Sequence, residues 1–309
     1  MIKNSKSHKK CELDRQIKSF CDFLIFEKHF SNNTVASYSR DLLIFKEYFD
    51  QNKDKNFLTL NHEDILAFLE NLYNFYIESS VSRLLSCLRS FYKFLLREDI
   101  VKKNPFAEIK NPLKPKNMIE ILDVDETKNF LDRLPHATKL ETRNKAMFEL
   151  IYSSGMRVSE IINLKLNDID YEENLIRCIG KGNKERIIPA GETAIHYLKV
   201  YIKSARLELQ GKKSAKSSEF VFLNKNGTKI TRQGFWKIMK KYAKQLNLNK
   251  NIYPHLFRHS YATHMLERGA DLRIVQELLG HSSISSTEIY TNINRKFIKD
   301  SFFRHHPRK

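Results

Sequence analysis

The sequence predicts two domains: an all-α N-terminal domain over residues 1–101, and a mainly α C-terminal domain over residues 118–309 that holds a small three-stranded antiparallel sheet. The first part shows only helical periodicity, whereas the second mixes helical stretches with short alternating segments typical of strands. Between them, residues 102–117 contain three prolines, which interrupt any regular helix and indicate a linker. With 309 residues, of which 41% are hydrophobic, the chain can bury a core in each domain.

Four amphipathic helices are predicted between residues 12 and 100, because apolar residues recur there at three- and four-residue spacing. The second helix follows the capping cluster of residues 31–34, the third follows Asn61, and the fourth begins near Ser80. We expect their apolar faces to form the core of the first domain. These faces consist of Phe20, Phe23, Leu24 and Phe30; of Tyr38, Leu42, Phe45 and Phe49; of Ile65, Phe68, Leu69 and Leu72; and of Leu84, Leu88, Phe91, Phe94 and Leu95.

The second domain is predicted to begin with two helices and then to form its sheet. A helix over residues 143–153 ends at Gly155, because glycine favours the left-handed conformation that closes a helix, and a short helix follows over residues 158–164. The strands are expected at residues 168–171, 175–179 and 185–189, with a turn at 180–184. Further helices are expected at about 192–209, 231–246, 256–268, 271–279 and 283–289, and a mobile basic loop at 212–218.

The formal net charge of +18 favours a polyanionic partner over a merely solvated basic surface. Residues 1–112 hold 18 Lys and Arg against 15 Asp and Glu, whereas residues 113–309 hold 36 against 21, so the excess lies mainly in the second part. No apolar run approaches the roughly 18–20 residues of a membrane span, and no signal-type block follows the basic first ten residues. We therefore expect nucleic acid rather than a membrane as the partner, and a cytoplasmic protein.

Neither a metal nor another cofactor is predicted. The four cysteines form no C-x-x-C pair, and no cluster of carboxylates could hold magnesium. His255 and His259 have the spacing of a zinc-binding pair, but the glutamate of the H-E-x-x-H motif is absent. Any chemistry on a phosphodiester would then run without a metal ion.

Several reactive side chains stand where the local structure would present them. His255 and Arg258 share one face of a helix, Arg157 follows a helix-ending glycine, and Lys181 lies on a hairpin tip. Guanidiniums can hold the oxygens of a phosphodiester, a lysine can protonate a leaving alkoxide, and a histidine can exchange protons near neutral pH. A tyrosine could be the nucleophile, but nothing in composition or periodicity selects one of the 13. The residues alone indicate a DNA-directed, phosphate-handling protein and leave the nucleophile open.

Five segments, in this order, resemble the tyrosine site-specific recombinases of the lambda-integrase superfamily, and most closely its Xer branch. They are residues 33–42, 154–160, 180–186 and 254–264, and the pair 278–281 with 287–291. Phe257 stands where the H-x-L-R-H motif commonly has leucine, and the ending His305–Arg308 resembles the D type of the Xer branch. The resemblance runs from about residue 13 to the end of the chain, and every catalytic position of the family is present.

This resemblance implies a division of roles among the candidate residues. Tyr290 would attack the scissile phosphate, forming a 3′-phosphotyrosyl link and freeing a 5′-hydroxyl. Arg157 and Arg258 would hold the non-bridging oxygens, and Lys181 would protonate the leaving 5′-oxygen. Because the phosphotyrosine conserves the bond energy, strand exchange would need no ATP.

The remaining assignments support this centre. His255 would assist proton transfer at the nucleophile, His281 would hydrogen-bond the phosphate, and Glu160 would orient neighbouring cationic groups. The first domain would clamp the DNA, and the linker, which could extend up to roughly 50 Å, would let the two domains grip opposite faces of a duplex. DNA contacts are assigned to Arg40, Lys184, Arg186 and Arg232.

The resemblance also implies an assembly and a task. Xer-type proteins act on two paired DNA sites as a homotetramer, or as a heterotetramer with a second recombinase, through a Holliday junction. The expected task is the resolution of chromosome dimers in the nucleoid, with a septal DNA translocase as an activator. The segment after Tyr290 resembles a tail that packs on a neighbouring subunit, the alternative being packing within the chain; its residues are Phe297, Ile298, Phe302 and Phe303.

Three other functions stay open at this point. One is an integrase of a phage or another mobile element, which shares the chemistry. A second is a relaxing enzyme similar to type IB topoisomerases, which uses the same nucleophile without choosing a site. A third is a DNA-binding protein that does not cut its target.

Overall fold

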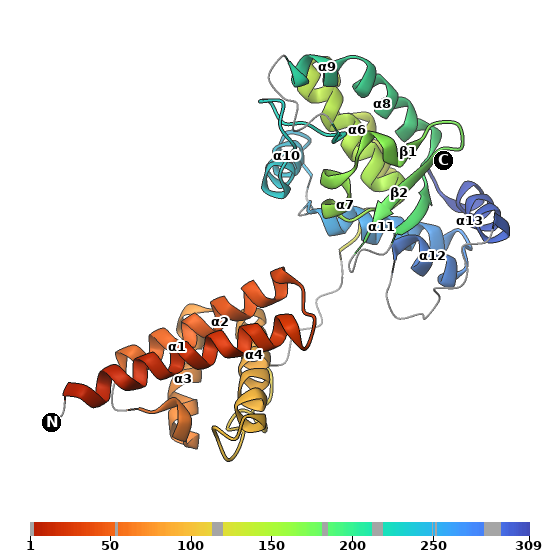
Figure 1. Ribbon diagram of the computed structural model, residues 1–309. Coiled ribbons are helices and arrows are strands. Elements are labelled where there is room, and N and C mark those ends of the chain that lie inside the picture. The colour runs from red at the N-terminus through yellow and green to blue at the C-terminus, as the bar shows by residue number, and fades with distance from the viewer. Residues whose placement is uncertain are drawn as a thin grey trace. The chain divides into compact units, whose positions relative to one another are not determined.

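A computed structural model of the chain describes residues 3–52, 55–112, 120–180, 185–211, 219–248, 250, 252–280 and 292–309, with side chains from residue 12 and, in the last segment, from residue 297. The chain divides into two compact units, Met1–Asn117 and Met118–Lys309. Figure 1 shows the first unit as a group of helices and the second as helices with a small sheet. The predicted fold class is confirmed.

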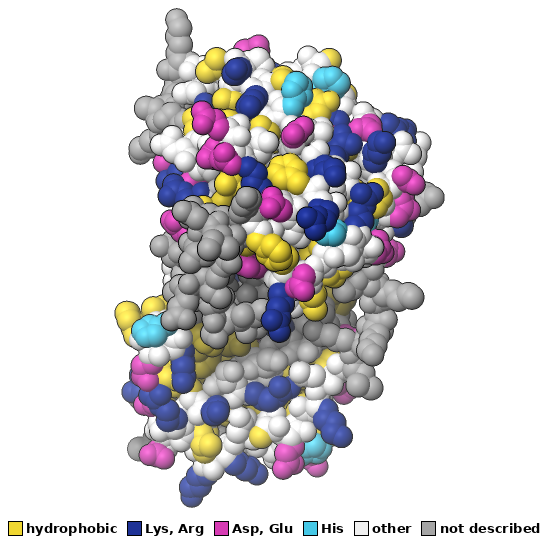
Figure 2. All heavy atoms as spheres, turned by 90° about the vertical axis from the view of Figure 1, so that its right-hand side faces the viewer, with side chains coloured by type: hydrophobic (Ala, Val, Ile, Leu, Met, Phe, Trp, Pro, Cys, Tyr) yellow, Lys and Arg dark blue, Asp and Glu magenta, His cyan; other side chains and the backbone are white. Residues whose placement is uncertain are grey.

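The surface carries both signs of charge. On the face shown in Figure 2, Lys and Arg side chains are spread over both units and are interspersed with Asp and Glu. Among the helices that the structure describes, none is long and apolar enough to cross a bilayer.

The first unit contains the four predicted helices. Its elements are α1 (Lys3–Phe26), α2 (Asn32–Gln51), the 3-10 turn η1 (Phe57–Thr59), α3 (His62–Phe75) and α4 (Glu78–Arg97). α2 begins after Ser31, whose hydroxyl accepts a hydrogen bond from the amide of Thr34. α3 begins after Asn61, which forms a reciprocal capping box with Asp64. The polar residues that predicted these starts therefore act as caps.

Aromatic residues dominate the core of the first unit. The ring of Phe45 lies 4.7 Å from that of Phe49 and 5.4 Å from that of Phe68, measured between ring centroids. Phe106 belongs to the predicted linker, yet it is fully buried and its ring lies 5.2 Å from that of Tyr92. The beginning of the predicted linker is therefore packed into this core.

The second unit starts with three helices, forms the sheet, and ends with helices. Its elements are α5 (Val124–Asp132), α6 (Lys139–Ser154), α7 (Val158–Asn163), the 3-10 turn η2 (Leu166–Asp168), β1 (Ile169–Asp170), β2 (Leu175–Ile179), β3 (Glu185–Pro189), α8 (Glu192–Lys203), α9 (Ala205–Gln210), α10 (Arg232–Gln245), α11 (Pro254–Glu267), α12 (Leu272–Leu279) and α13 (Asn292–His305).

Among the described residues, the sheet has the antiparallel order β1-β2-β3. Ile176 pairs with Ile188, and Cys178 pairs with Arg186, so these four side chains point to the same face. All four are buried. An arginine therefore occupies a position on the inner face of the sheet, between it and the helices.

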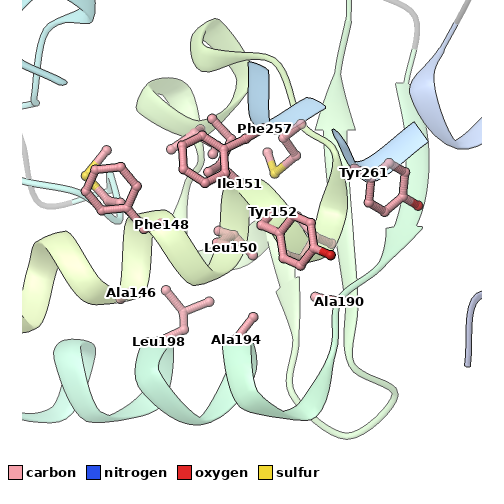
Figure 3. Packing of buried hydrophobic residues seen from close by; sticks show 14 of the residues in the cluster. Ala146, Phe148, Leu150, Ile151, Tyr152, Ala190, Ala194, Leu198, Phe257 and Tyr261 are labelled. Carbon is pink, nitrogen blue, oxygen red and sulfur yellow. The ribbon is translucent and has the colours of Figure 1, made fainter. Parts of the chain in front are cut away.

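Helix α6 is the centre of the second unit. Every residue from Thr142 to Ser154 is buried. Figure 3 shows α6 between α8, which contributes Ala194 and Leu198, and α11, which contributes Phe257 and Tyr261. The C-terminal end of α6 is thereby fixed by packing on two sides, and this end leads into Arg157.

Three helix predictions before residue 280 need correction. α6 begins at Lys139 rather than at residue 143, because Thr138 forms a capping box with Glu141. α5 was not predicted, although it begins with the same device at Asp123. The single helix expected over residues 192–209 is two helices, which meet at Ser204 where the backbone leaves the helical region. The helix expected at residues 283–289 lies outside the described residues.

The C-terminal helix α13, also unpredicted, packs within its own chain. Ile298 and Phe302 are buried in the core of the second unit, whereas Phe297 is 62% exposed. In this structure of a single chain, Ile298 and Phe302 therefore follow the alternative of packing within the chain, and packing on a neighbouring subunit stays a prediction. Their apolar side chains are covered by the unit to which they belong.

The last residues fasten this tail to α6. Arg308 donates hydrogen bonds of 2.7 and 2.8 Å to the two carboxylate oxygens of Glu149, which is fully buried. Glu149 also pairs with Lys145 one helical turn away, at 3.1 Å. The ring of His306 stacks on Phe302 with 4.8 Å between centroids. A charged anchor and a stacked ring thus hold the end of the chain.

Candidate active site

Arg157 lies at the sharp connection between α6 and α7. The chain leaves α6 at Gly155 in the left-handed conformation, with φ of +59°, and Arg157 is the capping residue of α7. A Cβ atom at Gly155 would also lie 2.6 Å from the ring of Tyr261, so space as well as conformation requires glycine here. The sequence prediction of a helix-ending glycine before the arginine is confirmed.

Glu160 holds Arg157 by two contacts. One carboxylate oxygen, Oε2, accepts the backbone amide of Arg157 at 2.7 Å, and Oε1 accepts Nη1 of its guanidinium at 3.1 Å. Because Glu160 lies in the first turn of α7, its contact with the backbone amide of Arg157 also caps the start of this helix. The side chain of Arg157 remains 31% exposed. The orienting role predicted for Glu160 is compatible with these contacts.

Arg258 reaches the same place from the second turn of α11. Its Nη1 donates to the carbonyl of Gly155 at 2.7 Å, and its Nη2 donates to the carbonyl of Leu279. Burial, followed by the nearby charge of Arg157, lowers the pKa of Arg258 to about 10. The guanidinium is therefore still cationic at neutral pH.

Arg186 completes this group but does not fit its predicted role as a DNA contact. It is 6% exposed, and its Nη1 and Nη2 donate to the two oxygens of Glu160, both at 2.8 Å. Its Nε donates to the carbonyl of Leu278 at 3.0 Å. A side chain buried between strand, helix and carboxylate presents its charge inward, so we withdraw it as a surface contact.

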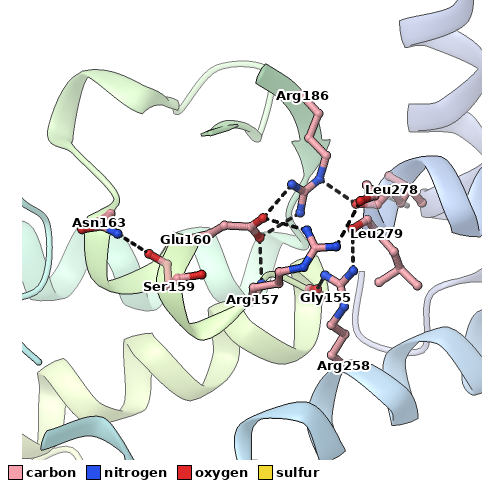
Figure 4. A network of polar contacts seen from close by, with 10 residues as sticks. Gly155, Arg157, Ser159, Glu160, Asn163, Arg186, Arg258, Leu278 and Leu279 are labelled. Atoms are coloured by element: carbon pink, nitrogen blue, oxygen red, sulfur yellow. Dashed lines mark hydrogen bonds and ion pairs between the residues drawn. The ribbon is translucent and has the colours of Figure 1, made fainter. Parts of the chain in front are cut away.

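Three arginines from three elements thus meet at the C-terminal end of α12 (Figure 4). The carbonyls of Leu278, Leu279 and Gly280 accept hydrogen bonds from Arg186, Arg258 and Arg157, respectively. Terminal carbonyls of a helix lack partners within the helix and carry partial negative charge, so they attract cations. Among the described residues, the carboxylate that pairs with this group is that of Glu160, which contacts Arg157 and Arg186. The pocket is suited to an anion.

Burial also affects the carboxyl of Glu160, but its neighbours prevail. Burial alone raises the pKa of this group. The hydrogen bonds and charge of Arg186, and then those of Arg157, outweigh that effect and bring the pKa below its ordinary value. Glu160 is therefore an anion at neutral pH, and it forms ion pairs with Arg157 and Arg186.

His255 stands in the first turn of α11, one turn before Arg258, and it is exposed. Partial burial of the ring lowers its pKa, and the charges of His259, Arg258 and Arg232 lower it further. The imidazole is therefore neutral at pH 7 and able to accept a proton. This arrangement fits the proton-transfer role expected from the sequence.

Four predicted site residues, Lys181, Lys184, His281 and Tyr290, lie outside the described residues. The two remaining predicted DNA contacts are exposed: Arg40 on α2, and Arg232 at the start of α10. Exposure is compatible with a DNA contact, and both assignments stay predictions.

Sequence reasoning missed the burial of Arg186, although a signal for it was present. Residues opposite each other in an antiparallel pair point to the same face. Ile176 and Cys178 alternate with Arg177, which predicts that the two apolar side chains face the core. In the register of β2 and β3, Arg186 lies opposite Cys178 and therefore on the same face. A charged side chain on a core face indicates a buried partner, which is Glu160.

Comparisons with known proteins agree with the motifs. Residues 120–296 match the Phage integrase family, and residues 17–99 match the N-terminal SAM-like domain of phage integrases. The chain is 43% identical to the tyrosine recombinase XerD of Oceanobacillus iheyensis over 96% of this chain and 99% of that protein. It is 42% identical to the XerD of Listeria monocytogenes over 94% of this chain and 98% of that protein.

Solved structures resemble this fold at lower identity. XerH site-specific recombinase bound to a palindromic difH substrate, in a post-cleavage complex, gives a TM-score of 0.67 at 23% identity, covering 86% of this chain and 78% of that one. The Tn1549 transposon integrase in complex with transposon right end DNA gives 0.70 at 17% identity, covering 91% and 98%. These likenesses support the fold.

Proposed function

The chain belongs to the phage integrase family and is a tyrosine recombinase, an enzyme that breaks and rejoins DNA, and on this basis we propose that it resolves chromosome dimers by site-specific recombination. The relatives that match almost the whole chain are named XerD. That name favours a chromosomal task over integration of a mobile element.

The arginine cluster at the end of α12 is the observation that supports the proposed chemistry. Arg157 and Arg258 would bind the non-bridging oxygens of the scissile phosphate and balance the charge that grows in the transition state. Each guanidinium has five N–H donors, so contacts to carbonyls and to phosphate oxygens can coexist. Because the carbonyls and Glu160 already orient both groups, little reorganisation is needed when the phosphate arrives.

The remaining steps are assigned to residues at the rim of this cluster. The phenolic oxygen of Tyr290 would form a bond to the phosphorus while the bond to the 5′-oxygen breaks. His255 would accept the phenolic proton, and Lys181 would give a proton to the 5′-oxygen, leaving a 5′-hydroxyl. His281 would hydrogen-bond the phosphate. Attack of a 5′-hydroxyl from another strand would reverse these transfers and release the tyrosine, so no cofactor is consumed.

The partners of the enzyme follow from the task. It acts on double-stranded DNA, and we propose that four subunits, either identical or shared with a second recombinase, assemble on two sites in the cytoplasm at the nucleoid. Arg40, Lys184 and Arg232 would contact the duplex outside the scissile position. A septal DNA translocase would activate the assembly.

The proposal is tested with a nicked duplex that carries the cognate site, so that the cut strand is lost and religation is prevented. We expect a protein–DNA adduct that survives denaturation, and its absence in Tyr290→Phe. Specific binding without any adduct in the wild type would support the binding function instead. Relaxation of a supercoil without recombination between two sites would support a relaxing enzyme.

A further inference from the structure

Arg186 and Glu160 form a buried ion pair inside the cluster. Nη1 of Arg186 donates to Oε1 of Glu160 and Nη2 donates to Oε2, each at 2.8 Å, and the two side chains are 6% and 2% exposed. Such parallel double contacts are the strongest and most directional geometry for this pair. Figure 4 shows Arg186 arriving from strand β3 on the side of Glu160 that faces away from α7.

The same carboxylate also holds Arg157, and this sharing determines the charge of the pocket. If Glu160 faced Arg157 alone, their charges would cancel, and a phosphate would meet a neutral pair. With Arg186 present, the carboxylate is neutralised from behind, and its contacts with Arg157 orient that side chain without cancelling its charge. The exposed part of Arg157 can then act as a full cation.

Arg186 has a second contact that ties the pair to α12. Its Nε binds the carbonyl of Leu278, and its side chain fills the space beside Gly280, where a Cβ atom would lie 3.1 Å from its Cδ. Gly280 has φ of +65° and ends α12. One side chain thus joins the strand β3, the carboxylate of α7 and the end of α12.

We propose that Arg186 is a positioning residue for strand cleavage: it neutralises Glu160 and braces the end of α12, so that Arg157 meets the scissile phosphate as an uncompensated cation. This inference rests on the proposed function, in which Arg157 binds that phosphate. In this proposal Arg186, which is 6% exposed, acts through Glu160 and Arg157 and not on the DNA itself.

The test compares single-turnover cleavage of the nicked duplex with the affinity for the same duplex, in four variants. Arg186→Gln is expected to cleave about 100-fold more slowly, with affinity changed about threefold or less, because transition-state charge is what it loses. The double variant Arg186→Gln with Glu160→Gln is expected to cleave about tenfold faster than Arg186→Gln alone, because it lacks the uncompensated carboxylate. Arg186→Lys, which keeps the charge, is expected to lie within about tenfold of the wild type.

Arg177→Gln is the matched control. Arg177 lies on the neighbouring strand β2 and pairs with the buried Asp168, where its Nη2 and Nε both donate to Oδ1, at 2.8 and 3.1 Å. It should retain wild-type cleavage in its folded fraction. A double variant that is no faster than Arg186→Gln would overturn the proposal, because the proposal attributes the deficit to the uncompensated charge of Glu160, which the double variant lacks.

A substrate with a methylphosphonate at the scissile position gives a second readout. It removes the negative charge of one non-bridging oxygen, so the deficit of Arg186→Gln should shrink on it. An unchanged deficit would also overturn the proposal. Wild-type cleavage by Arg157→Ala or Tyr290→Phe would contradict the proposed function itself. If both variants lose cleavage while Arg186→Gln cleaves like Arg177→Gln, only this inference is contradicted.

Discussion

At the scale of single residues, the site depends on where charge is left uncompensated. Arg157 and Arg258 each donate to backbone carbonyls, which orient them without cancelling their charge, while the carboxylate of Glu160 makes its double contact with Arg186. His255 is kept neutral by partial burial and by nearby cations. The proton acceptor His255 therefore lies on α11 one helical turn before Arg258, which belongs to the cationic pocket.

Replacing either clamp arginine should separate rate from affinity. We expect Arg157→Ala to cleave roughly 100-fold to 1000-fold more slowly than the wild type in a single turnover, since interactions aimed at developing charge have effects of this size. DNA affinity, measured by gel shift, should change far less, because many other phosphate contacts remain. Equal losses of rate and affinity would contradict a transition-state role.

The protonation of His255 should appear in the pH profile of cleavage. The folded pKa lies below the ordinary histidine value, so the neutral base is present at pH 7 and is lost as the pH falls through that lowered pKa. In His259→Gln one cause of the lowering is removed, and the acidic limb of the profile should move to higher pH. A limb that stays in place, or one that persists in His255→Ala, would show that another group controls it.

At the scale of elements, the connection between α6 and α7 places Arg157, and Gly155 is its hinge. Two separate demands fall on this glycine: a left-handed backbone and a close approach to the ring of Tyr261. Gly211 has a similar φ of +54°, but a Cβ atom there would meet nothing within 4 Å. The pair therefore separates steric overlap from backbone strain.

Gly155→Ala should lower the free energy of unfolding by about 1–3 kcal/mol more than Gly211→Ala, because only the former also overpacks the core. Urea titration of both variants measures the difference. Equal losses would mean that conformation alone requires glycine at the end of α6.

The anchor of the tail is testable in the same way. Arg308→Ala removes two contacts to the buried carboxylate of Glu149, and we expect a loss of up to about 3 kcal/mol in the free energy of unfolding. Lys145 still pairs with Glu149, which limits the loss. Arg304→Ala, at an exposed position on α13, is the control and should change stability little. If Arg308→Ala behaves like Arg304→Ala, the anchor does not fasten the tail.

Local signals predicted α2, α3 and the end of α6 at Gly155. The capping boxes that begin α5 and α6 are equally local signals and were overlooked. Other features depend on long-range contacts and could not be predicted locally. Ser204 shows no break signal in the sequence, and α13 owes its place to partners far along the chain, such as Glu149 with Arg308. The arginines of the site were predicted from motifs, but the burial of Arg186 depends on strand register.

At the scale of the whole molecule, the basic excess should govern DNA affinity. Each phosphate neutralised by Lys or Arg releases counterions, so the affinity should fall steeply and linearly in a plot of log affinity against log salt concentration. Titration of a labelled duplex at several salt concentrations gives the slope. A flat response would mean that the net charge of +18 is not used for binding DNA.

The identity of the residue that carries the cleaved strand is the most direct measurement. The wild-type chain would be trapped on a nicked duplex, digested with protease, and the nucleotide-bearing peptide mapped by mass spectrometry. We predict that the 3′-phosphate is esterified to the phenol of Tyr290. Attachment to any other residue would contradict the proposed cleavage chemistry.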